Sequence, residues 1–229
     1  MPFHATLLRE TDAERRQLLD TPIIRGALAG QVSVSSYLAF LREAYHHVRH
    51  TVPLLKAMKA TLPAHHRWLE PALDEYIEEE AGHDEWILND IAACGGDAEA
   101  VRHGRPSPAT EIMVAHAYDT VQRGNPLGFF GMVHVLEGTS VSLALLAADA
   151  IQKPLGLPDN GFSYLRSHGM LDREHTAHFE LLMDRITAAE DQQAIVHAAR
   201  MFYGLYRGVF LGLPLPQVAA SAPRAEVSA

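Results

Sequence analysis

Hydrophobic side chains recur every three to four residues along most of this chain, and this spacing predicts amphipathic α-helices. No stretch shows the alternation of hydrophobic and polar positions that would indicate β-strands. The spacing predicts seven helices, at about residues 6–19, 33–62, 64–94, 108–121, 126–151, 161–186 and 191–213. We therefore expect an all-α protein that folds as a single-domain helical bundle.

Proline and glycine residues set the expected helix boundaries. Pro53 lies inside the second helix and predicts a kink, because proline lacks a backbone N–H and crowds the preceding turn. Pro214 ends the last helix. Residues 1–213 are therefore expected to form one helical domain. Residues 214–229, which are rich in Ala, Ser and Pro, are expected to form a disordered tail.

The composition narrows the class of protein. The chain has 229 residues, of which 48% are hydrophobic, and a formal net charge of -9. This charge, without a dense cluster of Lys and Arg, argues against nucleic acid or an anionic membrane as a partner. Cys94 is the single cysteine, which excludes an internal disulfide and a cysteine-based metal site. We see no signal peptide and no apolar run of about 18 residues, so we expect a cytoplasmic protein. A homodimer is the commonest assembly of such chains.

Three segments place potential metal ligands three or four residues apart, and hence on one face of a helix. They are Glu80 with His83, His134 with Glu137, and His168 with Asp172 and His175. Any one of these pairs can arise by chance in a chain with 28 acidic residues and 14 histidines. Agreement between three separate helices makes a common metal site the favoured interpretation. Mixed carboxylate and imidazole ligands suit iron or manganese, and zinc is possible.

Glu137 is the most informative of these residues. It lies in the middle of a segment that is rich in small and apolar side chains, which predicts a buried helix. A buried carboxylate must be neutralised, paired with a cation or bound to a metal, because leaving it unpaired costs several kcal/mol. We therefore expect Glu137 to face the other ligands.

These motifs and their order resemble those of the heme-oxygenase-like diiron oxidases and oxygenases, within the wider group of thiaminase-like and pyrroloquinoline-quinone-synthesis-like folds. The resemblance covers about residues 37–210, and His168-x3-Asp172-x2-His175 is its most specific part. It implies two iron ions that activate dioxygen and six metal ligands. These ligands would be Glu80, His83, Glu137, His168, Asp172 and His175.

The resemblance leaves details of the ligand set open. Some members of the family place the first glutamate seven residues before the histidine, where this chain has Tyr76, whereas others use the spacing of Glu80. Glu79 is a lesser candidate. His134 and His178 lie beside the set in sequence and could hydrogen-bond to a ligating carboxylate and orient it.

Other members of the wider fold do different chemistry, and each would need its own residues. A thiaminase-like enzyme would use a cysteine nucleophile late in the chain, where this chain has only Cys94. A heme oxygenase would use a histidine close to the N-terminus, where only His4 is available. A ferritin-like diiron protein would need a second Glu-x-x-His motif, which only Glu43 and His46 could supply.

The favoured function is thus a nonheme diiron oxidase or oxygenase that uses dioxygen to oxidise a small metabolite. Arg49 and Tyr45, one turn apart, are the candidate substrate-binding residues. Arg49 could reach into a cavity and hold a substrate carboxylate, which would suit an amino acid or a fatty acid. The alternative is a noncatalytic or cofactor-free binding protein of the same fold, without a diiron centre.

Overall fold

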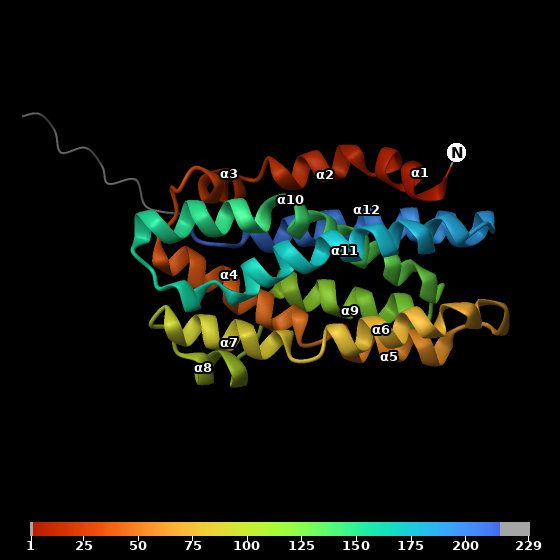
Figure 1. The fold of residues 1–229 in the computed structure, drawn as a ribbon, viewed down its shortest axis with the longest axis horizontal. Helices are drawn as coiled ribbons and strands as arrows, with labels where there is room; N and C mark the ends of the chain where they lie inside the picture. Colours follow the sequence, from red (N-terminus) through yellow and green to blue (C-terminus); the bar gives the residue numbers. More distant parts are fainter. Residues whose placement is uncertain (1, 216–229) are drawn as a thin grey trace, which may run out of the picture.

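The computed structural model is built from helices (Figure 1). It describes residues 2–215, with the exception of the side chains of residues 168–176. Within residues 2–215 there is no β-strand, so the prediction of an all-α fold is confirmed. The expected tail lies outside the described residues from 216 onwards. In chain order the helices are α1 (Phe3–Glu10), α2 (Asp12–Leu19), α3 (Pro22–Leu28), α4 (Val34–Val48), α5 (Thr51–Thr61), η1 (Ala64–Leu69), α6 (Glu70–Glu79), α7 (His83–Ala93), α8 (Ala98–His103), α9 (Pro108–Gln122), η2 (Pro126–Gly128), α10 (Phe129–Leu155), η3 (Asp159–Gly161), α11 (Ser163–Arg185) and α12 (Ala189–Leu211).

The helices form a bundle whose central members are α10, α11 and α12. In Figure 1, α1, α2 and α3 lie along one edge of the molecule, and α5, α6 and α7 lie along the opposite edge. α10 packs against both α11 and α12, while α4 packs against α7 and α9. Segments far apart in the sequence are thereby brought around one interior, in which most of the large apolar side chains are buried.

The second predicted helix is divided, and Pro53 accounts for the position of the break. α4 ends at Val48 and α5 begins at Thr51. In a continuous helix the N–H of residue 53 would bond to the carbonyl of Arg49, but proline has no N–H and its ring crowds that carbonyl. The chain therefore leaves the helix at Arg49 and His50, four and three residues before the proline, and a kink becomes a full break.

The third predicted helix is divided as well, at a position that matters for function. Instead of one helix over residues 64–94, the chain forms η1, α6 and α7. Gly82 separates α6 from α7 and has a φ of 89°. L side chains rarely adopt this backbone region, which glycine enters without steric cost. Divisions of this kind explain why the described chain has more helices than the seven expected.

α10 is the longest described helix and packs in the centre of the bundle. A Cβ atom at Gly131 would lie 2.5 Å from the backbone N of Ala199, so the absence of a side chain lets α10 approach α12 closely. No apolar run long enough to span a membrane is predicted from the sequence. Residues 126–155 contradict this, because by length and composition they could cross one. In the fold, this segment packs against α11 and α12.

The start of α11 is held by a buried carboxylate of α7. Asp90 accepts hydrogen bonds from the backbone N–H groups of Ser163 and Tyr164, at 3.0 and 2.9 Å, and from the Ser163 hydroxyl. These bonds satisfy free N–H groups at a helix N-terminus. Burial raises the pKa of Asp90 despite these hydrogen bonds. Asp90 therefore fixes where α11, which carries the third predicted ligand group, begins relative to α7.

Candidate functional site

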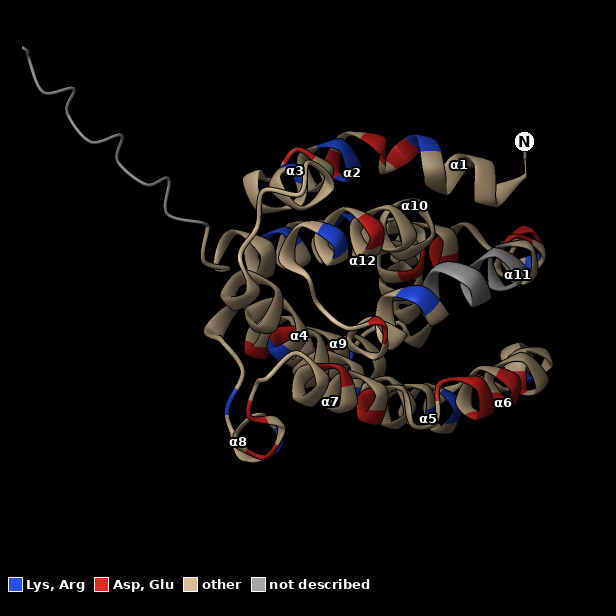
Figure 2. Cartoon of the chain, turned by 60° about the vertical axis from the view of Figure 1, so that its left-hand side comes forward, with Lys and Arg blue, Asp and Glu red and all other residues tan. Residues whose placement is uncertain are grey.

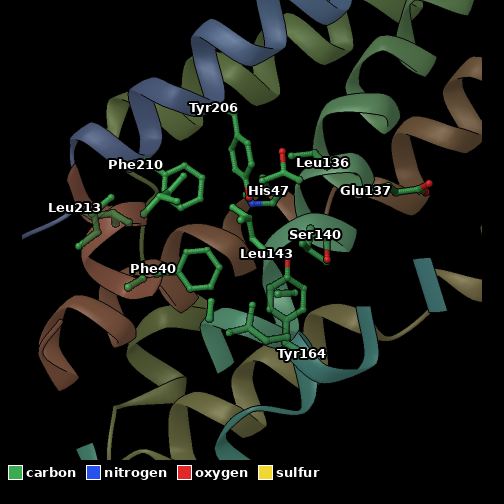
Figure 3. Close-up of a pocket in the computed structure, with 18 of the residues that line it drawn as sticks. Phe40, His47, Leu136, Glu137, Ser140, Leu143, Tyr164, Tyr206, Phe210 and Leu213 are labelled. Carbon is green, nitrogen blue, oxygen red and sulfur yellow. The ribbon is translucent and has the colours of Figure 1, made fainter. Parts of the chain in front are cut away.

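A cavity of about 160 Å³ lies between α3, α4, α10 and α12 (Figure 3). Most of the side chains that line it are apolar. Figure 3 shows Phe40, Leu143 and Phe210 facing one another across it, with the phenol rings of Tyr164 and Tyr206. The cavity is similar in size to the apolar cavity of about 150 Å³ that accommodates benzene in an engineered protein core. It can therefore hold a small apolar molecule.

Two of the predicted ligands, Glu80 and Glu137, line this cavity. They come from different parts of the chain, since Glu80 follows the last residue of α6 and Glu137 lies in the middle of α10. In Figure 3, Glu137 projects away from Phe40 and Phe210, so the carboxylate lies toward one end of the cavity. No Lys or Arg occurs among the described residues that line it. The cavity thus combines an apolar body with an acidic end.

Glu80 is paired with His83 across the break between α6 and α7. The Nδ1 atom of His83 lies 3.1 Å from Oε2 of Glu80. The His83 imidazole is 2% exposed and stacks on the indole of Trp86, with ring centroids 4.2 Å apart. The predicted proximity of these two ligands is therefore present. It arises from the turn at Gly82 and not from two positions on one continuous helix.

Apart from Glu80, the acidic residues of the run 74–80 are exposed to solvent. Asp74, Glu75, Glu78 and Glu79 are exposed. Figure 2 shows Asp and Glu positions, in red, along the ribbon of α6. Among the described residues of this run, Glu80 differs in that it lines the cavity.

The third predicted group lies outside the described side chains. His168, Asp172 and His175 all belong to the stretch for which only the backbone is described. That backbone is part of α11, which packs against α10 and against α7. The three segments that carry the predicted ligands are therefore neighbours in the fold, and the positions of these three side chains stay a prediction.

His134 makes its described contacts away from the cavity. Its Nε2 atom lies 3.2 Å from the Thr11 hydroxyl, and its ring packs against Phe179 and Tyr203. It is not among the residues that line the cavity, which include its neighbours Val133 and Leu136. The helix turns by about 100° per residue, so residue 134 points toward α2 and α12. His134 is a buried residue that packs against these side chains, and an orienting role for it stays a prediction.

His178 lies near α6. Its Nε2 atom is 3.9 Å from Oε2 of Glu75, and its ring meets the ring of Tyr76 edge to face. Tyr76 lines the cavity, so His178 lies behind a cavity residue. An orienting role for His178 stays a prediction.

Arg49 and Tyr45, which were expected to bind substrate, do not line this cavity, so a substrate-binding role for them stays a prediction. Arg49 is exposed, and its guanidinium lies over the ring of Tyr45, 5.3 Å from the ring centroid. Neither residue lines the cavity. Because the helix breaks at Arg49, this side chain emerges at the surface and does not continue the inward face of α4.

Sequence analysis missed His47 as a cavity residue. His47 was not among the candidate site residues, but it is buried and lines the cavity, and its neighbour His46 is buried as well. The spacing could have shown this, because His47 is seven residues after Phe40 and so shares its helix face. Tyr76 is a second cavity residue whose role the sequence did not suggest.

The residues that other chemistries of this fold would need make their contacts outside the cavity. Burial raises the pKa of the Cys94 thiol, and its Sγ faces the carbonyl of Gly161. His4 packs against Phe179. Glu43 accepts hydrogen bonds from the backbone N–H of Ser107 and the hydroxyl of Thr110, and so holds the start of α9. None of these side chains lines the cavity.

The same is true of the second Glu-x-x-His motif. His46, the partner of Glu43 in that motif, does not line the cavity either. The structure therefore gives no support to a cysteine nucleophile, a His4-ligated heme or a ferritin-like ligand set.

Comparisons with known proteins agree with this fold. A family model described as an iron-containing redox enzyme matches residues 38–207. A solved domain of unknown function with a heme oxygenase-like fold, from Shewanella denitrificans, is 23% identical, covers 92% of this chain and 90% of its own, and has a TM-score of 0.80. A TenA homolog from Pseudomonas syringae is 13% identical, with 91% of each chain covered and a TM-score of 0.74.

Heme oxygenase itself is also similar in fold. The enzyme from Leptospira interrogans is 16% identical, covers 93% of this chain and all of its own (100%), and has a TM-score of 0.69. No curated protein matches the sequence. At these identities the solved structures show the fold alone.

Proposed function

This chain belongs to the iron-containing redox enzyme family, and on that premise we propose that it is a nonheme diiron oxidase or oxygenase that acts on a small apolar metabolite. The family supports iron-dependent redox chemistry. The number of iron ions, the use of dioxygen and the substrate are the parts that the proposal adds.

The observation that carries the proposal is that Glu80 and Glu137 line one small, largely apolar cavity. Carboxylates from separate helices, with His83 held against one of them, form the mixed oxygen and nitrogen donor set that suits iron. Apolar walls beside such a set are typical of sites that keep water away from a reactive centre. The described residues therefore fit a metal centre at the acidic end of the cavity.

Glu80, His83 and Glu137 would hold the metal together with His168, Asp172 and His175 of α11. When bound, iron would supply the electrons that reduce dioxygen. The chain itself would orient the substrate between Phe40, Leu143 and Phe210 and exclude bulk water from it.

The cavity lining favours an apolar substrate over a polar one. Without Lys or Arg among the described lining residues, the cavity offers no cationic side chain for a substrate carboxylate, so its apolar walls supply most of the contacts. The hydroxyl of Tyr206 and the imidazole of His47 are polar groups that could orient one end of a substrate. Of the two classes suggested by sequence, a fatty acid fits better than an amino acid, because its chain is apolar and it carries no ammonium group.

Anaerobic titration with Fe²⁺, followed by exposure to dioxygen, tests the proposal. We expect about two Fe²⁺ per chain and a transient absorbance change after mixing with dioxygen. Glu137→Gln and Glu80→Gln should lose at least one iron and the transient. Glu78→Gln is the matched control, because Glu78 is exposed on the same acidic run and does not line the cavity.

The same experiment separates the alternatives. Less than one iron per chain and no transient in the wild-type protein, with intact helical circular dichroism, would reject the diiron proposal in favour of a binding protein. Stoichiometric binding of hemin with a shifted absorption band would indicate heme chemistry instead.

A further inference from the structure

Outside the cavity, three potential metal-binding side chains lie together: His65, His66 and Asp191. One donor atom from each lies within 4.8 Å of the other two. His65 and His66 are adjacent in η1, with ring centroids 4.1 Å apart, and Asp191 lies in the first turn of α12. None of the three lines the cavity.

His66 is buried, and its ring nitrogens are available to bind a metal ion. It is 7% exposed, and neither ring nitrogen has a hydrogen-bond partner among the described residues. Its Nε2 atom lies 2.9 Å from Oδ2 of Asp191, but the two atoms are not aligned for a hydrogen bond. Leaving a buried polar group without a partner costs about 1–3 kcal/mol. A cation between the two side chains would remove that cost.

Asp191 is oriented toward the histidines. Its Oδ1 atom accepts a hydrogen bond of 2.8 Å from the side-chain amide of Asn125, which leaves Oδ2 facing His66. Metal-ligating carboxylates are commonly held in this way by a further hydrogen-bond donor. The cluster thus contains three potential ligands, together with Asn125, which positions Asp191.

From this geometry we propose that His65, His66 and Asp191 bind one divalent transition-metal ion of the zinc type. Two imidazoles and one carboxylate with a further position open to water form a common zinc donor set. Zinc–ligand bonds of about 2.0–2.2 Å would place the donor atoms about 3.3 Å apart. His66 and Asp191 are already close enough, and the exposed His65 has room to rotate toward them.

The bound ion would join η1 to the start of α12, two elements that lie about 120 residues apart in sequence. His65 is exposed, so the ion can enter from solvent on that side. The site is independent of the proposed iron centre, because it shares no residue with it.

Zinc titration of the full, chelator-treated chain tests the site. By elemental analysis, the wild-type protein should bind one more Zn²⁺ per chain than His65→Ala or Asp191→Asn, and these variants should bind the ion at least about tenfold more weakly. Zn²⁺ should raise the melting temperature of the wild-type protein more than that of either variant. His66 is left intact because its burial makes folding of a variant uncertain.

Two controls keep the result specific. His103→Ala removes an exposed histidine of α8, which pairs with Glu99 instead, and should bind Zn²⁺ like the wild-type protein. Repeating the series in a Glu137→Gln background lowers the amount of zinc bound at the proposed iron centre, and the difference between wild-type and variant cluster should persist there. Equal zinc stoichiometry and equal thermal shifts in wild type, His65→Ala and Asp191→Asn would overturn the proposal, whatever the fate of the iron centre.

Discussion

Nδ1 of His83 lies 3.1 Å from Oε2 of Glu80, and the two residues meet because the helix between them is broken. Glu80 follows α6 and His83 begins α7, with the left-handed Gly82 between them. The acidic residues at 74–79 face solvent, whereas the Glu80 carboxylate lies at the cavity beside the buried His83 imidazole. Gly82 therefore determines the geometry of Glu80 and His83, two of the three described candidate ligands.

Replacing Gly82 with Ala should weaken iron binding. A Cβ atom at this position would meet nothing within 4 Å, so the cost is the backbone strain at a φ of 89°. That strain amounts to about 1–2 kcal/mol, and relieving it would move Glu80 relative to His83. We expect the free energy of unfolding to fall by about 1 kcal/mol and iron affinity to fall about tenfold, measured by urea denaturation and anaerobic titration.

Gly95 offers a matched control for this substitution. It also has a positive φ, of 81°, and open space around its Cβ position, but it follows α7 at the end remote from Glu80. Gly95→Ala should cost the same stability and leave iron binding unchanged. Equal loss of iron affinity in both variants would mean that Gly82 acts through global stability alone.

Asp90 should be required for stability and for the iron centre together. Asp90→Asn replaces one acceptor oxygen with a donor, which leaves N–H groups of Ser163 or Tyr164 without a partner. We expect a loss of about 1–3 kcal/mol in the free energy of unfolding. Iron affinity should also fall, because α11 loses its attachment to α7.

Asp97→Asn provides the comparison for Asp90. The exposed Asp97 caps α8 through the backbone N–H of Ala100, and asparagine caps helices about as well as aspartate. This variant should unfold like the wild-type protein. A similar loss in both variants would show that burial of Asp90 adds nothing to its capping role.

The sequence predicted the helical class and the Glu80–His83 pair because both follow from local spacing. It did not predict the break at Gly82, because a glycine inside a helical pattern does not reveal its own φ. The broken helix at Arg49 was misjudged for a related reason. Pro53 indicated a distortion, but only the fold shows that the chain leaves the helix and carries Arg49 to the surface.

The position of His134 could not be derived from spacing to Glu137 alone. Side chains three residues apart are neighbours on a helix, yet the cavity covers only part of the surface of α10. Glu137 and Leu136 face the cavity, whereas His134 faces α2 through Thr11. Which side of an apolar helix meets a cavity depends on its neighbours, and the sequence of one helix does not contain that information.

The burial of His134 should make stability depend on pH. Burial lowers its pKa to about 4, from an ordinary value of 6.5, and the positive charges of His4 and Arg15 act in the same direction. Between pH 6.5 and 4, His134 therefore binds a proton in the unfolded chain but stays neutral in the folded chain. This contribution to stability is complete above pH 6.5 and is lost as the pH falls toward 4, by about 3 kcal/mol in all.

His134→Leu should remove this loss, because leucine fills the apolar surroundings without titrating. The Thr11 hydroxyl keeps its hydrogen bond to the Leu7 carbonyl, so it is not left unsatisfied. Urea denaturation at pH 7.5 and pH 5 measures the effect. The difference between the two pH values should be smaller in the variant, and an unchanged difference would show that His134 does not contribute to it.

The glycines of α10 should respond to alanine in opposite directions. At Gly131 a Cβ atom would lie 2.5 Å from the backbone N of Ala199 and 2.7 Å from the carbonyl O of Ile195. Both contacts are with backbone, so α10 and α12 would have to separate, and we expect a loss of more than about 2 kcal/mol in the free energy of unfolding.

At Gly138, by contrast, a Cβ atom would meet nothing within 4 Å. Alanine there limits the unfolded chain and favours the helix, so Gly138→Ala should raise the free energy of unfolding by about 0.5–1 kcal/mol. Since Gly138 is next to Glu137 but does not line the cavity, iron stoichiometry should stay the same. If Gly131→Ala proved as stable as the wild-type protein, α10 and α12 could not lie as close together as described. The position of Glu137 relative to the rest of the bundle would then be incorrect as well.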